Sequence, residues 1–536
     1  MKDRGPGLRR ALALAFVAVC ASLITAGPAS ATIQYRVSLA QPDRHLFGVS
    51  MTIPVEGKEV IVAMPAWNAL YQIADFAYRV RDVTALCRSV DAVPASLRKL
   101  DKQTWRISVA SPCQPGDHNS FEIHYAILWD DPGPFNSQLD EHHAFINLAE
   151  ILMYVPDRRA EDVSVAFDNV PAGWRTATEL NADPGAANAY TASSYDKLVD
   201  APVEASKFDE FTFESDEAHF RVVVDPEVES GWNRVQLEDG LKRITEYELQ
   251  LMGGPPFDPP RREYTFIFHI GPDDEVEGGG MEHANSTAIS MSSVDSAIPV
   301  AAHEFFHVWN VKRIRPQSLE PVDYTREQYT RSLWFAEGVT SAYASFALVR
   351  TKLWTKYQFY GDLALQIGQL ESRPARAWQS AEESSFDAWF EKDDGYNEPD
   401  RSISYYNKGQ ILGVMLDLAI RDATENHKSL DDVFRLMNAE FAQQGKFYND
   451  DEGIRAAVEE VAGKSFQDFF RRYVGGTDEI HYDHFLGLAG LQVNRAALDQ
   501  KSLGAQLGTM YTITEINHPS ERQRRIREGM LRGTTD

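Results

Sequence analysis

Cysteine is scarce in this chain, which has three cysteines among 536 residues. Cys20 lies in an N-terminal segment described below, so Cys87 and Cys113 are left to form at most one disulfide with each other. A disulfide-rich scaffold is therefore excluded, and the pattern fits either one disulfide or two free thiols. Both cysteines lie far along the chain from the histidine motif described below, which argues against a role as metal ligands.

Basic residues are also few relative to acidic ones. The chain has 53 Lys and Arg against 79 Asp and Glu, which gives a formal net charge of −26 at pH 7. Such an acidic surface repels polyanions, which argues against nucleic-acid binding and against docking on anionic membranes.

Long hydrophobic runs are confined to the N-terminus. Residues 1–31 begin with Lys2 and Arg4, continue with an apolar run at 11–26 and end on Ala29-Ser30-Ala31. A basic start, a short apolar run and an A-x-A site are typical of a cleaved secretory signal peptide, whereas a spanning helix needs a longer run. We therefore expect an exported protein, periplasmic or secreted from a bacterium, with no stable membrane insertion after signal cleavage.

The first large region is predicted to be rich in β-strands. Alternation of apolar and polar residues recurs between 33 and 168, for example at 104–109 and 120–125, and Pro, Gly and Asp separate the short strands. This spacing is typical of a β-sandwich. The stretch 169–205 is rich in Ala, Asn, Asp, Pro and Ser and has little periodicity, so we place the domain boundary there.

The second region combines a small sheet with many helices, and the chain has no evident internal repeat. Strands are expected at 220–224 and 264–270 around a helix at 232–252. Further helices are expected at 297–311, 331–349, 406–422, 430–443 and 453–461. The fold class is therefore α+β and multidomain, with an N-terminal domain at 32–205 and a second domain at 206–489.

The most informative motif is H-E-F-F-H at residues 303–307. On a helix, His303 and His307 lie on one face and can bind one metal ion, while Glu304 lies beside the metal's open position and can transfer protons. A random match to H-E-x-x-H is expected only about 0.03 times in this chain. The alternative is two histidines on an ordinary amphipathic helix.

A catalytic zinc site usually needs a third protein ligand, and no third histidine follows nearby. The best candidate is Glu337 in L-W-F-A-E-G, because a carboxylate in an apolar stretch is costly to bury without a compensating cation. The alternative is a glutamate at a helix start that faces solvent.

Two further segments offer substrate contacts. Gly279-Gly280-Met281-Glu282 closes an acidic loop and is expected to open onto an edge strand at 287–290, where a peptide could pair and Glu282 could neutralise its free amine. A plain glycine-rich turn is an equal alternative. Tyr406 begins a predicted helix and could donate a hydrogen bond to an oxyanion, although a core tyrosine is the commoner case.

Two charged clusters have simpler explanations. The basic run at 312–315 could anchor a substrate carboxylate, but favourable charge at a helix C-terminus together with salt bridges explains it better. The acidic cluster at 393–400 lacks the spacing of a calcium loop, so a solvated loop is favoured.

Three motifs resemble the glycyl aminopeptidase family of zinc metallopeptidases. Residues 303–316, H-E-F-F-H-V-W-N-V-K-R-I-R-P, are similar to the family signature, 334–341 to its third-ligand motif and 404–409 to its catalytic tyrosine segment. The motifs occur in the family's order. A weaker similarity that includes Met64-Pro65-Ala66-Trp67 extends the resemblance over most of the chain.

The resemblance implies a thermolysin-like catalytic domain behind a β-rich domain, and one zinc ion held by His303, His307 and Glu337. It implies Glu304 as general base and Tyr406 as oxyanion donor. Gly279-Gly280-Met281-Glu282 is similar to the G-x-M-E element with which related aminopeptidases hold a substrate's N-terminus. His283 stands where those relatives commonly have Asn.

The C-terminal part departs from the family pattern. The family commonly ends in a PDZ domain, whereas 503–536 resembles only the opening portion of one. Residues 490–536 are therefore expected to form a truncated PDZ-like segment, and PDZ-type partner binding is not predicted.

Together these features predict an exported zinc metallopeptidase that hydrolyses peptides and removes small N-terminal residues such as Gly or Ala. The expected nucleophile is a zinc-bound water activated by Glu304. The alternatives are a zinc endopeptidase and a non-catalytic binding or scaffold protein on the same fold. An aminopeptidase should hydrolyse free peptides and fail on N-acetylated ones, which distinguishes it from an endopeptidase. A scaffold protein would show neither bound zinc nor peptidase activity.

Overall fold

The computed structural model describes residues 32–54, 57–68, 71–88, 92–110, 120–226, 232–257, 262–271, 278–497 and 509–535. The predicted signal peptide and Cys113 lie outside these ranges. Within them, no helix combines the length and the apolar character needed to cross a bilayer.

The N-terminal region is built from three β-sheets, as the alternating sequence pattern predicts. The largest has the order β13-β14-β11-β1-β2-β8-β4-β5, and the smaller sheets have the orders β12-β15-β10-β9 and β3-β7-β6. The large sheet contains β1 (Ile33–Gln41), β2 (Leu46–Pro54), β4 (Val80–Arg88), β5 (Ala92–Pro94), β8 (Ser120–Leu128), β11 (Val163–Asp168), β13 (Asn181–Ala182) and β14 (Ala189–Ala192). The smaller sheets contain β3 (Glu59–Ala63), β6 (Ser96–Lys99), β7 (Thr104–Ser108), β9 (Gln138–Leu139), β10 (His143–Ile146), β12 (Arg175–Ala177) and β15 (Val203–Ser206).

One face of the large sheet forms the core of this region. Burial alternates along β1 and β2, and the inward side chains, such as Val37 and Phe47, are fully buried. Two short helices, α1 (Leu148–Ile151) and α2 (Tyr195–Val199), complete the region. Cys87 of β4 is buried and disulfide-bonded.

The stretch 169–205, expected to hold the domain boundary, contains regular structure. Its strands β12 to β15 pair within the N-terminal sheets, for example β14 with β11 and β15 with β10. The chain changes sheet after Ser206, because β16 begins at Asp209 in a different sheet.

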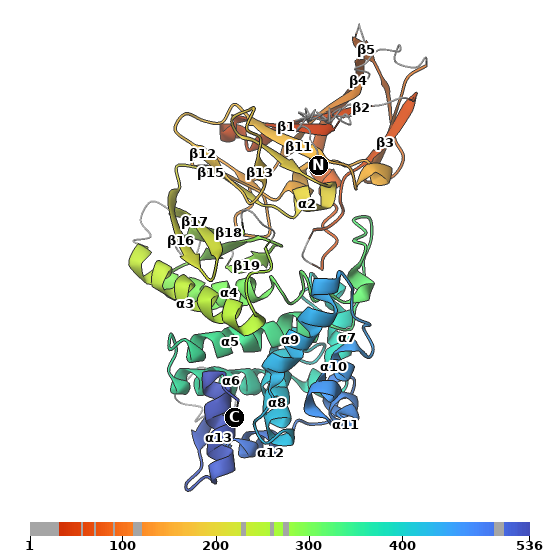
Figure 1. Cartoon of the computed structure of the whole chain (residues 1–536). Coiled ribbons are helices and arrows are strands. Elements are labelled where there is room, and N and C mark those ends of the chain that lie inside the picture. The colour runs from red at the N-terminus through yellow and green to blue at the C-terminus, as the bar shows by residue number, and fades with distance from the viewer. Residues whose placement is uncertain are drawn as a thin grey trace, which may run out of the picture.

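A five-stranded sheet follows, with the order β16-β17-β18-β20-β19. Its strands are β16 (Asp209–Ser215), β17 (Ala218–Pro226), β18 (Glu263–Ile270), β19 (Gly279–Glu282) and β20 (Ser286–Met291). Strands β17, β18 and β20 are parallel, and the long helix α3 (Arg234–Met252) connects β17 to β18. Figure 1 shows this sheet between the N-terminal strands and the helices.

The sheet corrects one prediction. Residues 287–290 were expected to form an edge strand, but they belong to β20, which pairs with β18 on one side and with β19 on the other. These residues are almost wholly buried, which fits an interior strand better than an edge. The glycine-rich segment 279–282 is itself the edge strand, β19.

A helical lobe packs against this sheet. Its helices are α4 (Val294–Phe306), α5 (Thr340–Arg350), α6 (Lys356–Glu371), α7 (Ala381–Phe386), α8 (Tyr405–Ala423), α9 (Leu430–Glu440), α10 (Gly453–Ala462), α11 (Gln467–Phe469), α12 (Tyr482–Leu488) and α13 (Glu521–Arg532). Two π-helical turns, Trp334–Val339 and Phe470–Val474, precede α5 and follow α11. Short 3₁₀ helices lie at Pro42–Arg44, Phe76–Arg79, Pro156–Arg158, Gln317–Leu319, Pro374–Ala377, Ala388–Phe390 and Ala442–Gln444.

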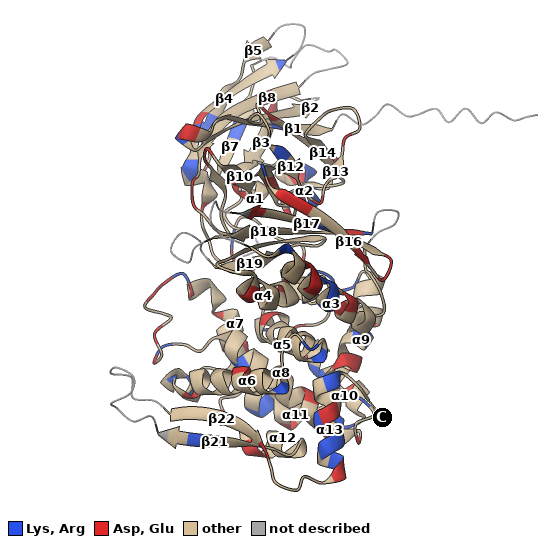
Figure 2. Ribbon diagram, turned by 90° about the vertical axis from the view of Figure 1, so that its left-hand side faces the viewer, with Lys and Arg blue, Asp and Glu red and all other residues tan. Residues whose placement is uncertain are grey.

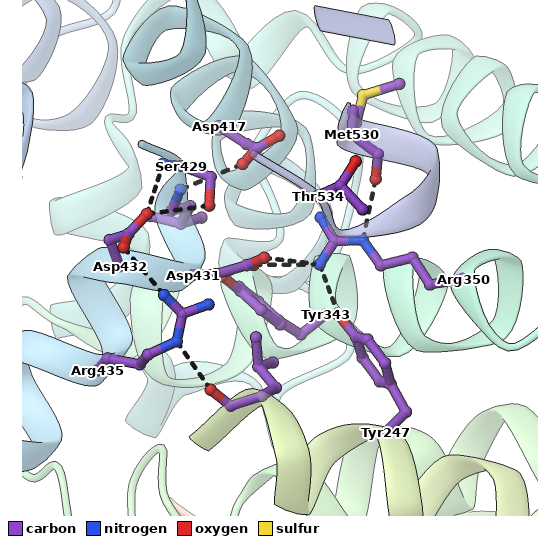
Figure 3. A network of polar contacts seen from close by, with 12 residues as sticks. Tyr247, Tyr343, Arg350, Asp417, Ser429, Asp431, Asp432, Arg435, Met530 and Thr534 are labelled. Atoms are coloured by element: carbon purple, nitrogen blue, oxygen red, sulfur yellow. Dashed lines mark hydrogen bonds and ion pairs between the residues drawn. The ribbon is translucent and has the colours of Figure 1, made fainter. Parts of the chain in front are cut away.

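The segment predicted to be PDZ-like packs onto this lobe. It forms a hairpin of β21 (Leu491–Ala497) and β22 (Thr509–Glu515), followed by α13 (Figure 2). Lys356 at the start of α6 pairs with Glu515 of β22 at 2.7 Å. Figure 3 shows a second attachment. Arg350 of α5 donates to the carbonyl of Met530 at 2.9 Å and pairs with buried Asp431 at 3.1 Å.

Candidate active site

Helix α4 carries the H-E-F-F-H motif and is held on most sides by the core. It begins with a capping box in which Ser293 and Ser296 exchange hydrogen bonds, and its residues Ala301, Ala302 and Phe305 are fully buried. One stripe of the helix is left to face a cavity. His303 and His307 both lie on this stripe, as the spacing of the motif predicts.

Glu337 completes a cluster with the two histidines. Its Oε2 lies 3.5 Å from Nε2 of His303 and 3.2 Å from Nε2 of His307, and the two histidine nitrogens are 2.9 Å apart. Ligand atoms at zinc distances on a tetrahedron are separated by about 3.3 Å, so the cluster matches a zinc site. The side chain of Glu337 is 5% exposed, so the alternative of a solvent-facing glutamate is wrong.

The charges of the cluster support each other. Burial opposes ionisation of Glu337, but the neighbouring His307 and His303 outweigh it and hold the pKa of this carboxyl well below its usual range. Burial likewise opposes protonation of His307, and the charge of Glu337 outweighs it and raises the pKa of His307 to about 10. A buried carboxylate with two imidazoles is a donor set that suits a divalent cation.

The outer ring nitrogens of both histidines are occupied. Nδ1 of His307 donates to the carbonyl of Asn310 at 2.6 Å, and Nδ1 of His303 lies 3.2 Å from Oγ of Ser341. In the neutral form of each ring, Nε2 therefore turns a lone pair to the cavity, the arrangement that metal ligation requires. The Asn310 amide also donates to the carbonyl of Phe335 at 2.9 Å and to Oγ1 of Thr340 at 3.0 Å, which ties α4 to the segment that carries Glu337.

Two glycines bring α8 against the π-helical turn. A Cβ atom on Gly409 would overlap the carbonyl oxygen of Trp334, and one on Gly338 would overlap the backbone of Gly409. Gly338, directly after Glu337, and Gly409, three residues after Tyr406, therefore lack side chains because the two backbones touch. This contact places Tyr406, in the first turn of α8, beside the metal cluster.

Tyr406 faces the cavity. Its ring centre lies 6.1 Å from that of His303, and the residue is 39% exposed, so the alternative of a core tyrosine is wrong. The neighbouring Tyr405 is the buried one and donates to Glu391 at 3.3 Å.

Glu304 lies under the edge strand β19. The residue is 5% exposed and its Oε2 has no hydrogen-bond partner among the described residues. Burial raises the pKa of Glu304 well above its usual value, and the charges of Glu282 and Glu337 add to that effect while His307 opposes it. A Cβ atom on Gly280 would overlap this carboxylate, so only glycine allows the strand to pass this close.

Glu282 ends the edge strand and points into the same cavity. Its carboxylate, that of Glu304 and a ring nitrogen of His307 lie within 4.8 Å of one another. Within the described ranges, the Glu282 carboxylate has no ion pair or hydrogen bond. The other edge of β19 pairs with no strand, so the glycine-rich segment is more than a turn.

The N-terminal region supplies one wall of the cavity, which the sequence did not reveal. Tyr71, Gln72 and Phe135 line it together with Glu391 from the helical lobe. Phe135 lies so close to Gly279 that a Cβ atom there would be 2.9 Å from its ring. No local pattern marks these residues, because they join the site only through the packing of distant segments.

The salt bridges expected for the basic run at 312–315 are present, but α4 ends at Phe306, so this run does not lie at the end of that helix as predicted. Lys312 pairs with Asp200 at 2.9 Å, Arg315 pairs with Glu320 at 2.6 Å, and Arg313 donates to the carbonyl of Ala284 at 3.0 Å. The acidic residues at 393–400 form an exposed loop. They contribute to none of the converging ligand groups found among the described residues.

Comparison with known families decides the class of protein. A family model described as M61 glycyl aminopeptidase matches residues 296–412, and a model of the peptidase M61 N-terminal domain matches residues 34–207. The chain belongs to the M61 glycyl aminopeptidase family. It is a metallopeptidase, and its three motifs lie around one cavity.

Solved structures share the architecture. The crystal structure of an aminopeptidase N family protein from Idiomarina loihiensis superposes with a TM-score of 0.80 at 23% identity and covers 89% of this chain and 82% of that one. The crystal structure of an M1 zinc metallopeptidase from Deinococcus radiodurans aligns over 84% of this chain and 94% of its own. The identity is 14% and the TM-score is 0.48. No curated protein matches the chain.

Proposed function

We propose that the protein is a zinc-dependent aminopeptidase that removes small residues from peptide N-termini. The observation that carries this proposal is the carboxylate of Glu282, which has no partner among the described residues, ends an edge strand and lies within 4.8 Å of the Glu304 and His307 ligand atoms. A free amine at this carboxylate would place the first peptide bond of a substrate next to Glu304. An internal segment of a longer chain has no N-terminal amine to pair with Glu282.

One zinc ion would be held by His303, His307 and Glu337. The residues fit the ion, because three donor atoms converge at 2.9–3.5 Å and the outer nitrogens of both histidines are already occupied. When bound, zinc supplies an electrophile that polarises the substrate carbonyl and acidifies water.

Glu304 and Tyr406 would transfer and stabilise charge. The unpartnered oxygen of Glu304 faces the cavity, where it can accept a proton from the attacking water and then donate it to the leaving amine. The phenol of Tyr406, on the other side of the cluster, would donate a hydrogen bond to the oxyanion.

The substrate backbone would pair with the open edge of β19. Strand addition supplies main-chain hydrogen bonds without regard to side chains, and the glycines at 279 and 280 leave room for a second backbone. Phe135 and Tyr71 from the N-terminal region line the cavity near this strand, which limits the room for the first side chain. This crowding supports the preference for Gly or Ala that the family name suggests.

Glu282→Gln tests the end preference. The wild type should hydrolyse Gly- and Ala-initiated peptides and fail on their N-acetylated forms. The variant keeps the size of the side chain and loses its charge, so KM for free peptides should rise by about tenfold or more. The ratio of the hydrolysis rate of acetylated peptides to that of free peptides should therefore increase. Glu246→Gln on the exposed face of α3 is a matched control. Equal cleavage of free and acetylated peptides by the wild type would instead indicate an endopeptidase.

Glu304→Gln tests the mechanism. Loss of a positioned general base costs about 10²–10⁴-fold in turnover, whereas the zinc ligands are untouched. We expect kcat to fall by this factor while zinc content, measured by mass spectrometry, stays that of the wild type. Full activity in the variant would contradict the role of Glu304.

We also propose that the protein is exported. The support is the basic, apolar and A-x-A pattern of residues 1–31. N-terminal sequencing of protein from the periplasm or medium should begin at Thr32, and recovery of the intact chain from the cytoplasm would contradict export.

A further inference from the structure

A second cluster of metal-ligand side chains lies at the junction between the N-terminal sheets and the five-stranded sheet. His143 of β10 and Glu204 of β15 come from the N-terminal side, and Asp225 of β17 and His269 of β18 come from the other. Glu204 pairs with Phe145 across β10 and β15, and Asp225 lies opposite His269 across β17 and β18. Figure 1 shows β15 beside β17 and β18, at the place where the two sets of strands meet.

The inner atoms of His143, Glu204 and His269 lie within 4.8 Å of one another, and Asp225 approaches a ring nitrogen of His143. Nε2 of His269 lies 3.0 Å from Oε2 of Glu204. Nδ1 of His143 lies 3.7 Å from the same oxygen and 3.6 Å from Oδ2 of Asp225. These separations resemble those of the catalytic cluster, which run from 2.9 to 3.5 Å. Both sets are close to the edge of about 3.3 Å expected for a tetrahedral ion with bonds of about 2.0–2.1 Å.

The outer atoms of three of these groups are held by neighbours. Nε2 of His143 lies 3.0 Å from Oε1 of Gln138, and Nδ1 of His269 lies 3.4 Å from Oγ of Ser290. Oγ of Ser206 donates to Oδ1 of Asp225 at 3.0 Å. Such outer hydrogen bonds orient metal ligands and leave the inner lone pairs free.

The interior of the cluster is short of partners. Glu204 is fully buried and its Oε1 has no hydrogen bond among the described residues, and the same holds for the buried Nδ1 of His143. Unpaired buried polar atoms are costly, and a cation bound by His143 and the Glu204 carboxylate would reduce that cost.

We propose that His143, Glu204, Asp225 and His269 form a second site for a divalent transition-metal ion of the zinc class. Two imidazoles and two carboxylates suit zinc and cobalt better than calcium or magnesium. With Asp225 as the fourth ligand no position is left open, so the site would be structural and would join the two regions.

The proposal competes with a metal-free ion-pair network. Without an ion, burial opposes charge on Glu204, but the neighbouring His143 and His269 outweigh it and lower the pKa of Glu204 to about 2. Glu204 likewise overcomes burial and raises the pKa of His143 to about 9. A protonated His143 would then stand where the proposal places the cation. Direct metal binding distinguishes the two.

The test uses the full chain with His303→Gln and His307→Gln, which removes the proposed catalytic site. After dialysis against a chelator, this protein should bind one equivalent of Co²⁺ with the visible absorption of a tetrahedral ion, and Zn²⁺ should raise its Tm. Adding either His143→Gln or Glu204→Gln should abolish both effects. His124→Gln, at a half-exposed histidine paired with Glu122 at 3.0 Å, is the matched control.

Metal content of the wild-type protein gives a second measurement. Two zinc ions per chain are expected, falling to one in His143→Gln and to one in the His303→Gln, His307→Gln protein. A folded His303→Gln, His307→Gln protein that binds no Co²⁺ would overturn the second site, as would binding that survives both His143→Gln and Glu204→Gln. A single ion that persists without His303 and His307 would support the second site and contradict the catalytic one.

Discussion

Glu248 of α3 is an ionisable residue left without a partner in the core. It is fully buried, and neither carboxylate oxygen has a hydrogen bond among the described residues. Burial therefore raises the pKa of Glu248 well above its usual value. The folded state holds this proton at pH values where the unfolded chain has lost it.

Glu248→Met should stabilise the protein at neutral pH. A buried polar group without a partner costs about 1–3 kcal/mol, and Met fills a similar volume without that cost. Because the folded pKa is raised, the wild type loses stability as pH rises from about 4.5 through the folded pKa, so the gain in Tm should shrink toward pH 4.5. Thermal unfolding of both proteins between pH 4.5 and neutral pH measures this difference in Tm. Glu246→Met, at an exposed position of α3, should show no such dependence, and an equal gain at all pH values would contradict the assignment.

The sequence identified the residues whose chemistry is local and missed those that packing supplies. His303, Glu304 and His307 follow from one helical spacing. Asn310 was visible in the same motif, but its two roles, holding His307 and the Glu337 segment, depend on a contact between separate helices. Tyr71 and Phe135 reach the cavity from loops of the N-terminal region, and no spacing along the chain encodes that approach.

Helix α8 and the π-helical turn at Trp334–Val339 cross with their backbones in contact. The contact depends on Gly338 and Gly409. Because one element carries Glu337 and the other carries Tyr406, the crossing sets the distance between a metal ligand and the proposed oxyanion donor.

Gly409→Ala should weaken metal binding. The added methyl group overlaps the carbonyl of Trp334, so α8 or the turn must shift. Displacing groups that hold metal ligands typically costs about 10–100-fold in metal affinity or activity, and we expect a loss in that range, measured by competition with a zinc chelator. Gly361→Ala on α6 is the control, because a Cβ atom there meets nothing within 4 Å. Unchanged zinc affinity in Gly409→Ala would show that the crossing tolerates a side chain.

Among the elements, long amphipathic helices were predicted well and the sheet edge was not. The predicted helix at 406–422 corresponds to Tyr405–Ala423, since an apolar face with a period of 3.6 is a strong signal. Helix α6 (Lys356–Glu371) escaped prediction. The edge was assigned to 287–290 instead of 279–282, because the order of strands in a sheet is set by pairing that sequence periodicity does not record.

At the scale of the whole molecule, the segment after β22 satisfies two buried arginines. Arg350 donates to the carbonyl of Met530 at 2.9 Å, and Arg421 donates to that of Thr534 at 2.7 Å. Both guanidinium groups have 0% side-chain exposure and each also pairs with an aspartate, Asp431 or Asp417. Helix α13 thus acts as part of the core of the helical lobe.

Deleting residues 518–536 should destabilise the helical lobe. Removing partners from a buried charged group costs about 3–5 kcal/mol, so Tm should fall by several degrees or more. Differential scanning calorimetry measures the fall, and a chain that lacks only residues 535 and 536 is the control. An unchanged Tm in the longer deletion would show that the arginines find other partners.

The cavity draws its walls from two separate stretches of the chain. The residues proposed for proton transfer and metal binding lie after residue 280, whereas Tyr71, Gln72 and Phe135, which restrict the space beside β19, lie in loops of the N-terminal region. Substitutions of Tyr71, Gln72 or Phe135 can therefore change which peptides the enzyme accepts without disturbing its reaction. Two relatives that exchanged their N-terminal sheets would exchange the peptides they accept and keep the bond-breaking step that each already performs.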